Sequence, residues 1–285
     1  DACLVGSEMC IRDRSYSEGK SEKNIGELLP LFSKDKFQIS TKARLDPNSS
    51  ESIISQLDRK IDASLGRLQR NFVELYQLHN RIQSVGDKDN FSAKDILKRG
   101  GVADAMEKFK SDERIKSIGI TALGDIDAIN EVVLSDCFDV AQIYYNLLNP
   151  SASYNSSRNW NDHDFSNLIN NCISKDMGLM NIRIYAAGYL ATDKRHGREI
   201  PVTFGINENE LNRRVEKINS IFDDIRGTKA QKALRYGLSN KNMSTIVIGL
   251  ANIEHLEEAL EGYDQGHLDE ETLMTIEELQ NKNFY

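Results

Sequence analysis

The feature that most constrains this chain is a repeated alternation of short apolar runs with amphipathic segments. The runs are rich in β-branched and aromatic side chains and cover residues 37–41, 72–78, 118–123, 140–148, 179–185 and 245–250. Short, continuous apolar runs of this kind are typical of strands that are buried on both faces.

The segments between the runs carry apolar residues at steps of three and four, which is the spacing of an amphipathic helix. The clearest example contains Ile53, Ile54, Leu57, Ile61, Leu65 and Leu68. Asn48, with Glu51 three residues later, predicts the N-terminal cap of this helix. Further helices are expected at residues 25–32, 102–109, 127–134, 165–173, 210–222, 253–260 and 269–278, and a long loop at residues 191–209.

Strands that alternate with helices predict a parallel sheet with right-handed crossovers. Six β-α units are visible, whereas a closed (β/α)8 barrel needs eight. The alternative is a doubly wound open sheet, but no GxGxxG sequence follows any of the runs. We therefore predict an α/β fold, a TIM barrel over residues 16–285 that is incomplete at the N-terminus. Residues 1–15 show neither the strand pattern nor the helix pattern, and the sequence does not begin with Met. We therefore expect a non-native or disordered opening segment there.

Composition limits the classes of partner. The formal net charge of −8 argues against nucleic acid, because phosphate binding needs a basic face. No apolar stretch approaches the roughly 20 residues of a membrane-spanning helix. Cys3, Cys10, Cys137 and Cys172 form no CxxC pair and lie at no metal-binding spacing, so no metal is expected. With no secretory signal visible, we expect a cytoplasmic protein.

Seven short motifs follow one another along the chain: YSEGKSE at 16–22, ISTK at 39–42, DASLGRL at 62–68, LYQLHN at 75–80, IGIT at 118–121, QIYYN at 142–146 and IG at 248–249. Each motif is weak by itself, but their order and spacing over roughly residues 16–263 are specific. Together they resemble the motifs of the aldo-keto reductase family, in particular a bacterial branch related to aldose and sugar dehydrogenases. The resemblance implies a barrel that transfers hydride between a nicotinamide cofactor and a carbonyl or alcohol.

The resemblance implies that Tyr16, Lys42 and His79 are the catalytic residues. Lys42 and His79 stand at the ends of consecutive predicted strands, and the ends of parallel barrel strands share the rim where active sites form. Reducing a carbonyl requires a proton on oxygen, and a free tyrosine has a pKa of about 10. A nearby ammonium lowers that pKa. Tyr16 would therefore be the acid, Lys42 would lower its pKa, and His79 would orient the substrate oxygen.

The resemblance also implies a cofactor site. Gln142 matches the glutamine that binds the nicotinamide amide, Thr121 stands where serine is usual, and Arg183 is expected to line the cofactor. Gly249, His255 and Glu258 match the positions that surround the adenosine end. Little positive charge remains there for a 2′-phosphate, so both NADP and NAD stay open as the cofactor.

The residues are consistent with two functions of different classes, an enzyme and a nucleotide-binding protein. The first is an NAD(P)-dependent oxidoreductase that acts on a small-molecule aldehyde, ketone or aldose. The second is a catalytically silent barrel that binds nicotinamide nucleotide as a sensor or partner subunit. The set of Tyr16, Lys42 and His79 favours the first. Two departures from the family pattern favour the second: Ile11 stands where the family has an aspartate, and Ala122 where it has an asparagine.

Overall fold

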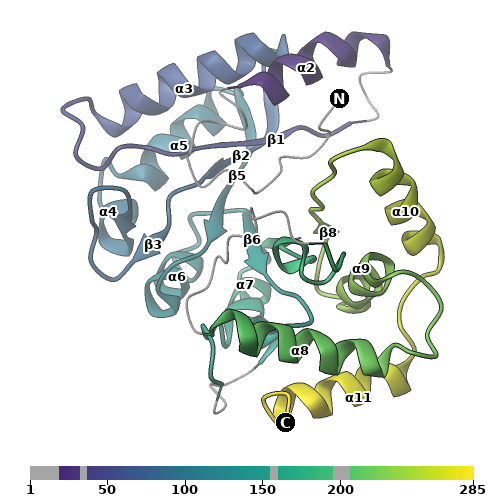
Figure 1. Ribbon diagram of the computed structural model, residues 1–285. Coiled ribbons are helices and arrows are strands. Elements are labelled where there is room, and N and C mark those ends of the chain that lie inside the picture. The colour runs from purple at the N-terminus through teal and green to yellow at the C-terminus, as the bar shows by residue number, and fades with distance from the viewer. Residues whose placement is uncertain (1–18, 33–36, 155–159, 195–205) are drawn as a thin grey trace.

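The centre of the molecule is a six-stranded parallel sheet whose strands lie in chain order (Figure 1). The computed structural model describes residues 19–32, 37–154, 160–194 and 206–285. The strands are β1 (Ser40–Ala43), β2 (Val73–Leu78), β5 (Ile115–Ala122), β6 (Val140–Tyr144), β7 (Gly178–Ile182) and β8 (Thr245–Ile246). Every predicted apolar run overlaps one of these strands. A separate small pair, β3 (Ile82–Gln83) with β4 (Phe91–Ser92), follows β2.

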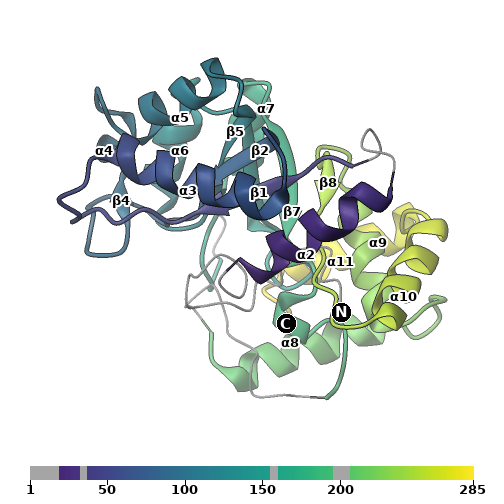
Figure 2. The ribbon, with the colours of Figure 1, turned by 90° about the horizontal axis from the view of Figure 1, so that it is seen from above.

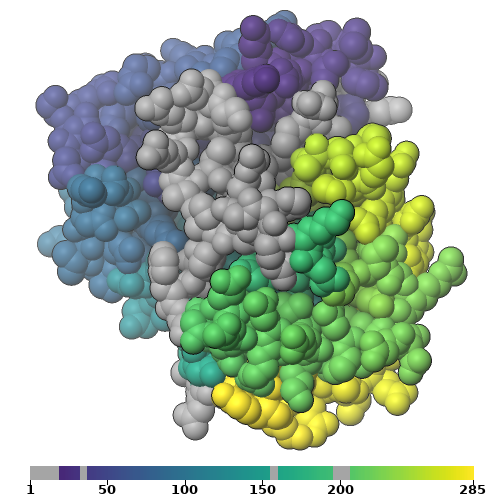
Figure 3. Space-filling view, viewed as in Figure 1, coloured from purple at the N-terminus to yellow at the C-terminus, as the bar shows by residue number. Residues whose placement is uncertain are grey.

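Helices follow or connect the strands, as the alternating pattern predicts (Figure 2). The first half contains α2 (Lys20–Leu28), α3 (Ile53–Leu68), α4 (Ala93–Leu97), α5 (Val102–Ser111) and α6 (Ile126–Val133). The second half contains α7 (Leu168–Ser174), α8 (Glu208–Ile221), α9 (Lys229–Ser239), α10 (Ile253–Asp264) and α11 (Glu270–Asn281). Short 3-10 turns lie at Leu29–Leu31, Ser151–Ser153 and Ala186–Gly188. The space-filling view shows α2 and α3 at the top of the molecule, α10 at its right and α8 toward its bottom (Figure 3).

The sheet is curled, so one of its faces is concave. Lys42 on β1 and Gln142 on β6 are three places apart in strand order, which on a flat sheet is about 14 Å. Their side chains nevertheless form a 3.1 Å hydrogen bond. Only curvature brings them together, because side chains on a flat sheet stand roughly parallel to one another. The predicted barrel-type α/β fold is confirmed, and the described residues supply six of its strands. Residues 1–15 lie outside the described part of the chain.

One local prediction was wrong, and two helices, α4 and α9, were not predicted. The helix at residue 53 is capped by Ser52, whose hydroxyl accepts the Ser55 N–H, and not by Asn48. Asn48 instead donates its backbone N–H to Asp46, in one of several local side-chain turns that precede the helix. Helix α9 was not predicted, although Thr228 and Gln231 form a capping box at its start.

A buried carboxylate joins α2 to the first strand. Glu22 is 4% exposed, and its Oε1 accepts the Thr41 hydroxyl at 2.6 Å. Its Oε2 accepts Arg67 Nε at 2.6 Å from α3. Thr41 directly precedes Lys42, so this network fixes the strand that carries the predicted catalytic lysine.

At the opposite end of the molecule, a buried arginine also joins separate elements of the fold. Arg214 on α8 is fully buried, forms a 3.0 Å ion pair with Glu210 and lies 3.7 Å from Asp162. Its guanidinium also lies over the rings of Trp160 and Phe284. Arg214 therefore holds α8, the segment after β6 and the C-terminal residues together.

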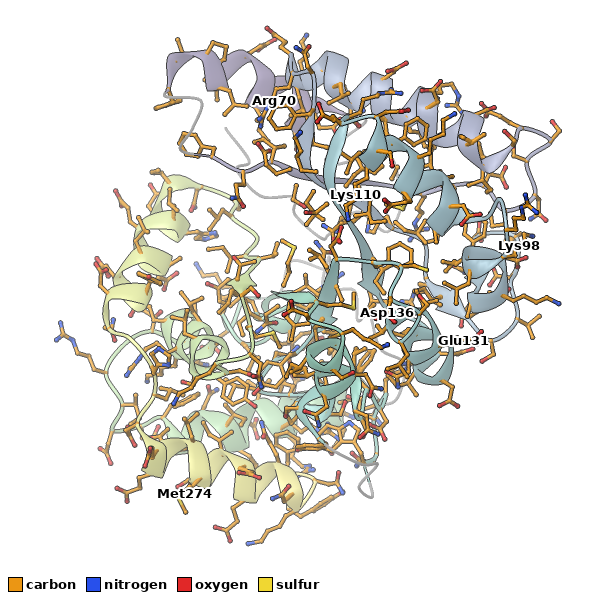
Figure 4. All side chains as sticks on the ribbon, turned by 180° about the vertical axis from the view of Figure 1, so that it is seen from behind. Arg70, Lys98, Lys110, Glu131, Asp136 and Met274 are labelled. Atoms are coloured by element: carbon orange, nitrogen blue, oxygen red, sulfur yellow. The ribbon has the colours of Figure 1, made fainter. Side chains whose placement is uncertain are left out.

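Ion pairs join helices to neighbouring turns on the side of the molecule drawn in Figure 4, where Lys110 and Asp136 are labelled. Lys110 on α5 donates to both carboxylate oxygens of Asp139 at 2.8 Å, and Lys175 to Asp136 at 2.8 Å. Exposed pairs of this kind stabilise a protein little. In the described ranges, no helix has the length and apolar character required to span a membrane.

Candidate active site

Three of the predicted site residues lie on the concave face of the sheet, toward its carboxyl edge. Thr121 on β5 and Gln142 on β6 are direct register partners. Lys42 on β1 pairs with Gln77, which pairs with Gly119, two residues before Thr121. Side chains two residues apart on a strand point to the same face, so all three residues share that face.

The three side chains form one buried hydrogen-bonded chain. Lys42 Nζ donates to Gln142 Oε1 at 3.1 Å, and the Thr121 hydroxyl donates to the same oxygen at 3.4 Å. Their exposed fractions are 4% for Lys42 and Gln142 and 2% for Thr121. A buried ammonium is costly unless it is hydrogen-bonded, so its retention here points to a functional role. Gln142 Nε2 makes no hydrogen bond to any described residue.

His79 stands at the carboxyl end of β2, next to the end of β1. Its backbone N–H donates to the Ala43 carbonyl at 2.9 Å, and its side chain is half-buried. The following residue, Asn80, accepts the Leu45 N–H and donates to the Leu45 carbonyl, both at 2.8 Å. This clamp holds the segments after β1 and β2 side by side. The sequence comparison included Asn80 in a motif but did not predict its clamping role.

Arg183 directly follows β7 in a strained segment. Its φ is 62°, and Ala186 and Ala187 also have positive φ, at 46° and 58°. Left-handed backbone is uncommon outside glycine and tends to cluster at functional sites. Asn146, fully buried after β6, holds the segment by donating to the Arg183 carbonyl at 3.0 Å. Asn146 is a second positioning residue that sequence reasoning did not single out.

Two more of the predicted residues, His255 and Glu258, line a cavity at α10. The cavity has a volume of about 410 Å³ and is lined by Thr228, Gln231, Glu254, His255, Glu257, Glu258 and Glu261. A Cβ built on Gly249 would meet nothing within 4 Å, so space is open beside it. Burial, and to a smaller extent the Glu258 carboxylate, raise the pKa of Tyr185 to about 12.

The structure thus gathers the predicted residues into two groups. Lys42, Thr121 and Gln142 form the buried chain, with His79 at the adjacent strand end, whereas His255 and Glu258 line the α10 cavity. Tyr16 lies outside the described residues. Among the residues that are described, no group of three or more His, Cys, Asp or Glu side chains is arranged to hold a metal ion.

Comparison with known proteins identifies the family of this chain. The aldo/keto reductase family model matches residues 14–281. L-galactose dehydrogenase from Arabidopsis thaliana is 24% identical over 282 residues, covering 92% of this chain and 76% of the plant protein.

Solved structures share the fold. The holo form of aldo-keto reductase AKR11C1 from Bacillus halodurans superposes with a TM-score of 0.69 at 18% identity, covering 93% of this chain and 80% of that one. An aldo/keto reductase from Klebsiella pneumoniae, solved with NADP and acetate, gives a TM-score of 0.65 at 20% identity, covering 93% and 77%. Because the family model spans nearly the whole chain, this protein belongs to the aldo/keto reductase family.

Proposed function

We propose that this protein is an oxidoreductase that uses a nicotinamide nucleotide to interconvert a carbonyl and an alcohol, with small aldehydes, ketones or aldoses as substrates. The observation that carries the proposal is the buried chain of Lys42, Gln142 and Thr121. A buried ammonium on the concave face is costly to retain, and it suits a site where charge develops during a reaction. The name of the plant relative adds aldoses to the substrates worth testing.

Each residue has a separate role in this proposal. Tyr16 donates the proton to the substrate oxygen, and the Lys42 ammonium stabilises the phenolate that this transfer leaves. His79, at the rim beside Lys42, hydrogen-bonds the substrate oxygen and orients it. The nicotinamide supplies the hydride when it is bound.

The described residues fit such a cofactor at two points. Gln142 Nε2 has no partner among them and is available to a carboxamide oxygen. The α10 cavity, with open space beside Gly249, accommodates the adenosine end. Four glutamates line this cavity, while His255 is its sole basic side chain, and the His255 Nδ1 already accepts the Ala251 N–H. A 2′-phosphate would meet this negative charge, so we propose that NAD binds at least as well as NADP.

The test combines binding with turnover. Calorimetry with NADH and NADPH gives the two dissociation constants, and steady-state assays then use aldehydes, ketones and aldoses. Tyr16→Phe is expected to lower kcat by about 100-fold or more while changing NADH affinity little, because general acid catalysis contributes on that scale. Tyr263→Phe is the matched control, since Tyr263 is 63% exposed. Turnover by Tyr16→Phe within about threefold of the parent would rule out the assigned acid.

A catalytically silent nucleotide-binding barrel is the second candidate. Two residues favour it: Ile11 in place of the family's aspartate and Ala122 in place of its asparagine. Binding of NADH or NADPH without turnover of any tested carbonyl would favour this candidate.

A further inference from the structure

One buried carbonyl oxygen on the concave face has no hydrogen-bond partner in the described part of the chain. Gln77 lies on β2 and is 1% exposed. Its Nε2 donates to the Ser40 hydroxyl at 2.9 Å, but its buried Oε1 accepts no hydrogen bond from the described residues. An amide oxygen buried without a donor is costly, and most buried polar atoms in proteins are paired. The Oε1 atom therefore indicates a donor that reaches it in another state of the protein.

The fold places this oxygen beside the predicted catalytic lysine. Gln77 is the direct register partner of Lys42, and neighbouring strands lie about 4.8 Å apart. Ser40 stands two residues before Lys42 on the same strand, so all three side chains share the concave face. Because Nε2 is held on Ser40, the planar amide does not turn freely, and Oε1 stays on the side away from that hydroxyl.

A glycine on the next strand leaves room for the Gln77 side chain. Gly119 is the register partner of Gln77 on β5. A Cβ added to Gly119 would lie 2.8 Å from the Val140 carbonyl oxygen and 3.1 Å from Gln77 Cγ. Any larger residue at this position would therefore crowd the glutamine, and the concave face keeps space for its amide.

The Lys42 ammonium shares its acceptor with another donor. Gln142 Oε1 accepts Lys42 Nζ at 3.1 Å and the Thr121 hydroxyl at 3.4 Å. In the proposed function, Gln142 also meets the nicotinamide carboxamide, and two amides that pair use both their oxygens and their nitrogens. Gln142 Oε1 is then drawn away from the ammonium when the cofactor is bound. A buried ammonium that loses an acceptor needs another one.

We propose that Gln77 is a positioning residue that takes over the Lys42 ammonium when the cofactor is bound. Its Oε1 accepts the N–H that Gln142 releases, and the ammonium keeps a fixed place from which it stabilises the Tyr16 phenolate. This inference rests on the proposed reductase function and adds one residue to it. Gln77 acts through Lys42 and does not itself react.

The direct test observes the lysine nitrogen by NMR. The protein is prepared with 15N-labelled lysine, and the Lys42 Nζ resonance is assigned by its absence in Lys42→Met. The measured quantity is the rate at which the Lys42 ammonium protons exchange with water, which is slow while they are hydrogen-bonded. Without NADH, the parent and Gln77→Met should exchange equally, because Gln142 holds the ammonium in both. With saturating NADH, exchange in Gln77→Met should be faster than in the parent by about 3- to 10-fold, the range that one hydrogen bond provides.

Turnover provides a second readout. Gln77→Met should lower kcat for reduction by about 3- to 10-fold and leave the KM for NADH nearly unchanged. Reduction requires the protonated phenol, so its decline at high pH should move upward by about 0.5 to 1 pH unit when the ammonium is held less firmly. Ser117→Ala is the control, because Ser117 lies on the same face two residues before Gly119 and should change neither readout.

Melting curves establish that each variant is folded, and Gln77→Glu provides a second variant. Its carboxylate keeps an acceptor, so exchange should remain as slow as in the parent with NADH and without it. If Gln77→Met does not fold, faster exchange in Gln77→Glu contradicts the proposal and retained slow exchange supports it.

The outcomes separate this proposal from the proposed reductase function. If the parent reduces no tested carbonyl but the difference in exchange appears with NADH, the role of Gln77 stands and the reductase function fails. Three results would overturn the role of Gln77 even if the parent is active. They are equal exchange in the parent and Gln77→Met with NADH, an equally large difference without NADH, or the same effects in Ser117→Ala. A parent that binds neither NADH nor NADPH would overturn both proposals.

Discussion

The Glu22 network allows a quantitative test of how this fold positions its site. Glu22→Gln keeps an amide oxygen that can still accept the Thr41 hydroxyl, but it places an amide NH2 group toward Arg67, which is itself a donor. Removing one partner of a buried ion pair costs about 3–5 kcal/mol. Glu22 has a side chain only 5% exposed, but Arg67 is 30% exposed, so water recovers part of that loss. The expected decrease in the free energy of unfolding is therefore about 2–4 kcal/mol.

Urea unfolding followed by circular dichroism measures this free energy, and a thermal melt provides an independent readout. A loss of about 3 kcal/mol corresponds to a fall in Tm of about 6–12 °C for a domain of this size class. Because Thr41 adjoins Lys42, kcat should also fall in the variant at temperatures where it remains folded.

The matched control is Glu27→Gln on the same helix. Glu27 is 56% exposed and lies 3.8 Å from Lys23, so its pair should contribute no more than about 0.5 kcal/mol. If Glu22→Gln and Glu27→Gln are equally stable, the buried pair does not hold α2 to β1 and the reasoning fails. The double variant Glu22→Gln with Arg67→Met should cost about 1–3 kcal/mol less than the sum of the single variants, because the two residues contact each other directly.

Two further predictions concern the site and the thiols. Lys42→Met should reduce kcat by about 100-fold or more, because the ammonium beside the reacting groups is lost; steady-state assays giving kcat within about threefold of the parent would make Lys42 structural. Burial raises the pKa of the Cys172 thiol to about 12, so below that pH it stays protonated and unreactive. At pH 8, in a background of Cys3→Ser and Cys10→Ser, a chromogenic disulfide should modify the exposed Cys137 and leave Cys172 unmodified until the protein unfolds; rapid modification of two thiols would contradict this.

The strands and most helices could be predicted because their signals are local. Each apolar run reports burial on both faces, and each three-to-four repeat reports one buried helix face, as in α3. Helix α9 was missed because small and polar residues, such as Ala230, Gln231 and Gly237, form much of its buried face, so the apolar repeat is weak. Only the capping box of Thr228 with Gln231 marks its start. The start of helix α3 was also hard to predict from the sequence. Asn48 and Ser52 both have side chains that can cap a helix, and only the surrounding turns decide between them.

The candidate site could be predicted only in part. Lys42, His79, Thr121 and Gln142 were identified from motifs at strand ends. The hydrogen bond from Lys42 to Gln142 spans 100 residues of sequence, and no local pattern encodes it. The positioning roles of Asn80 and Asn146 were also missed, because each depends on a backbone group in a distant segment.

The sequence by itself determined which segments become strands and helices, and which polar residues stand at the strand ends. Local periodicity and side-chain chemistry are sufficient for that, since strands and helices differ in repeat and in turn residues. Only the tertiary structure decided that Lys42 reaches Gln142, and that Asn146 holds the Arg183 carbonyl. The physical reason is the curvature of the sheet, which arises from strand twist and from packing against the helices over the whole domain, and which brings side chains from β1 and β6 together.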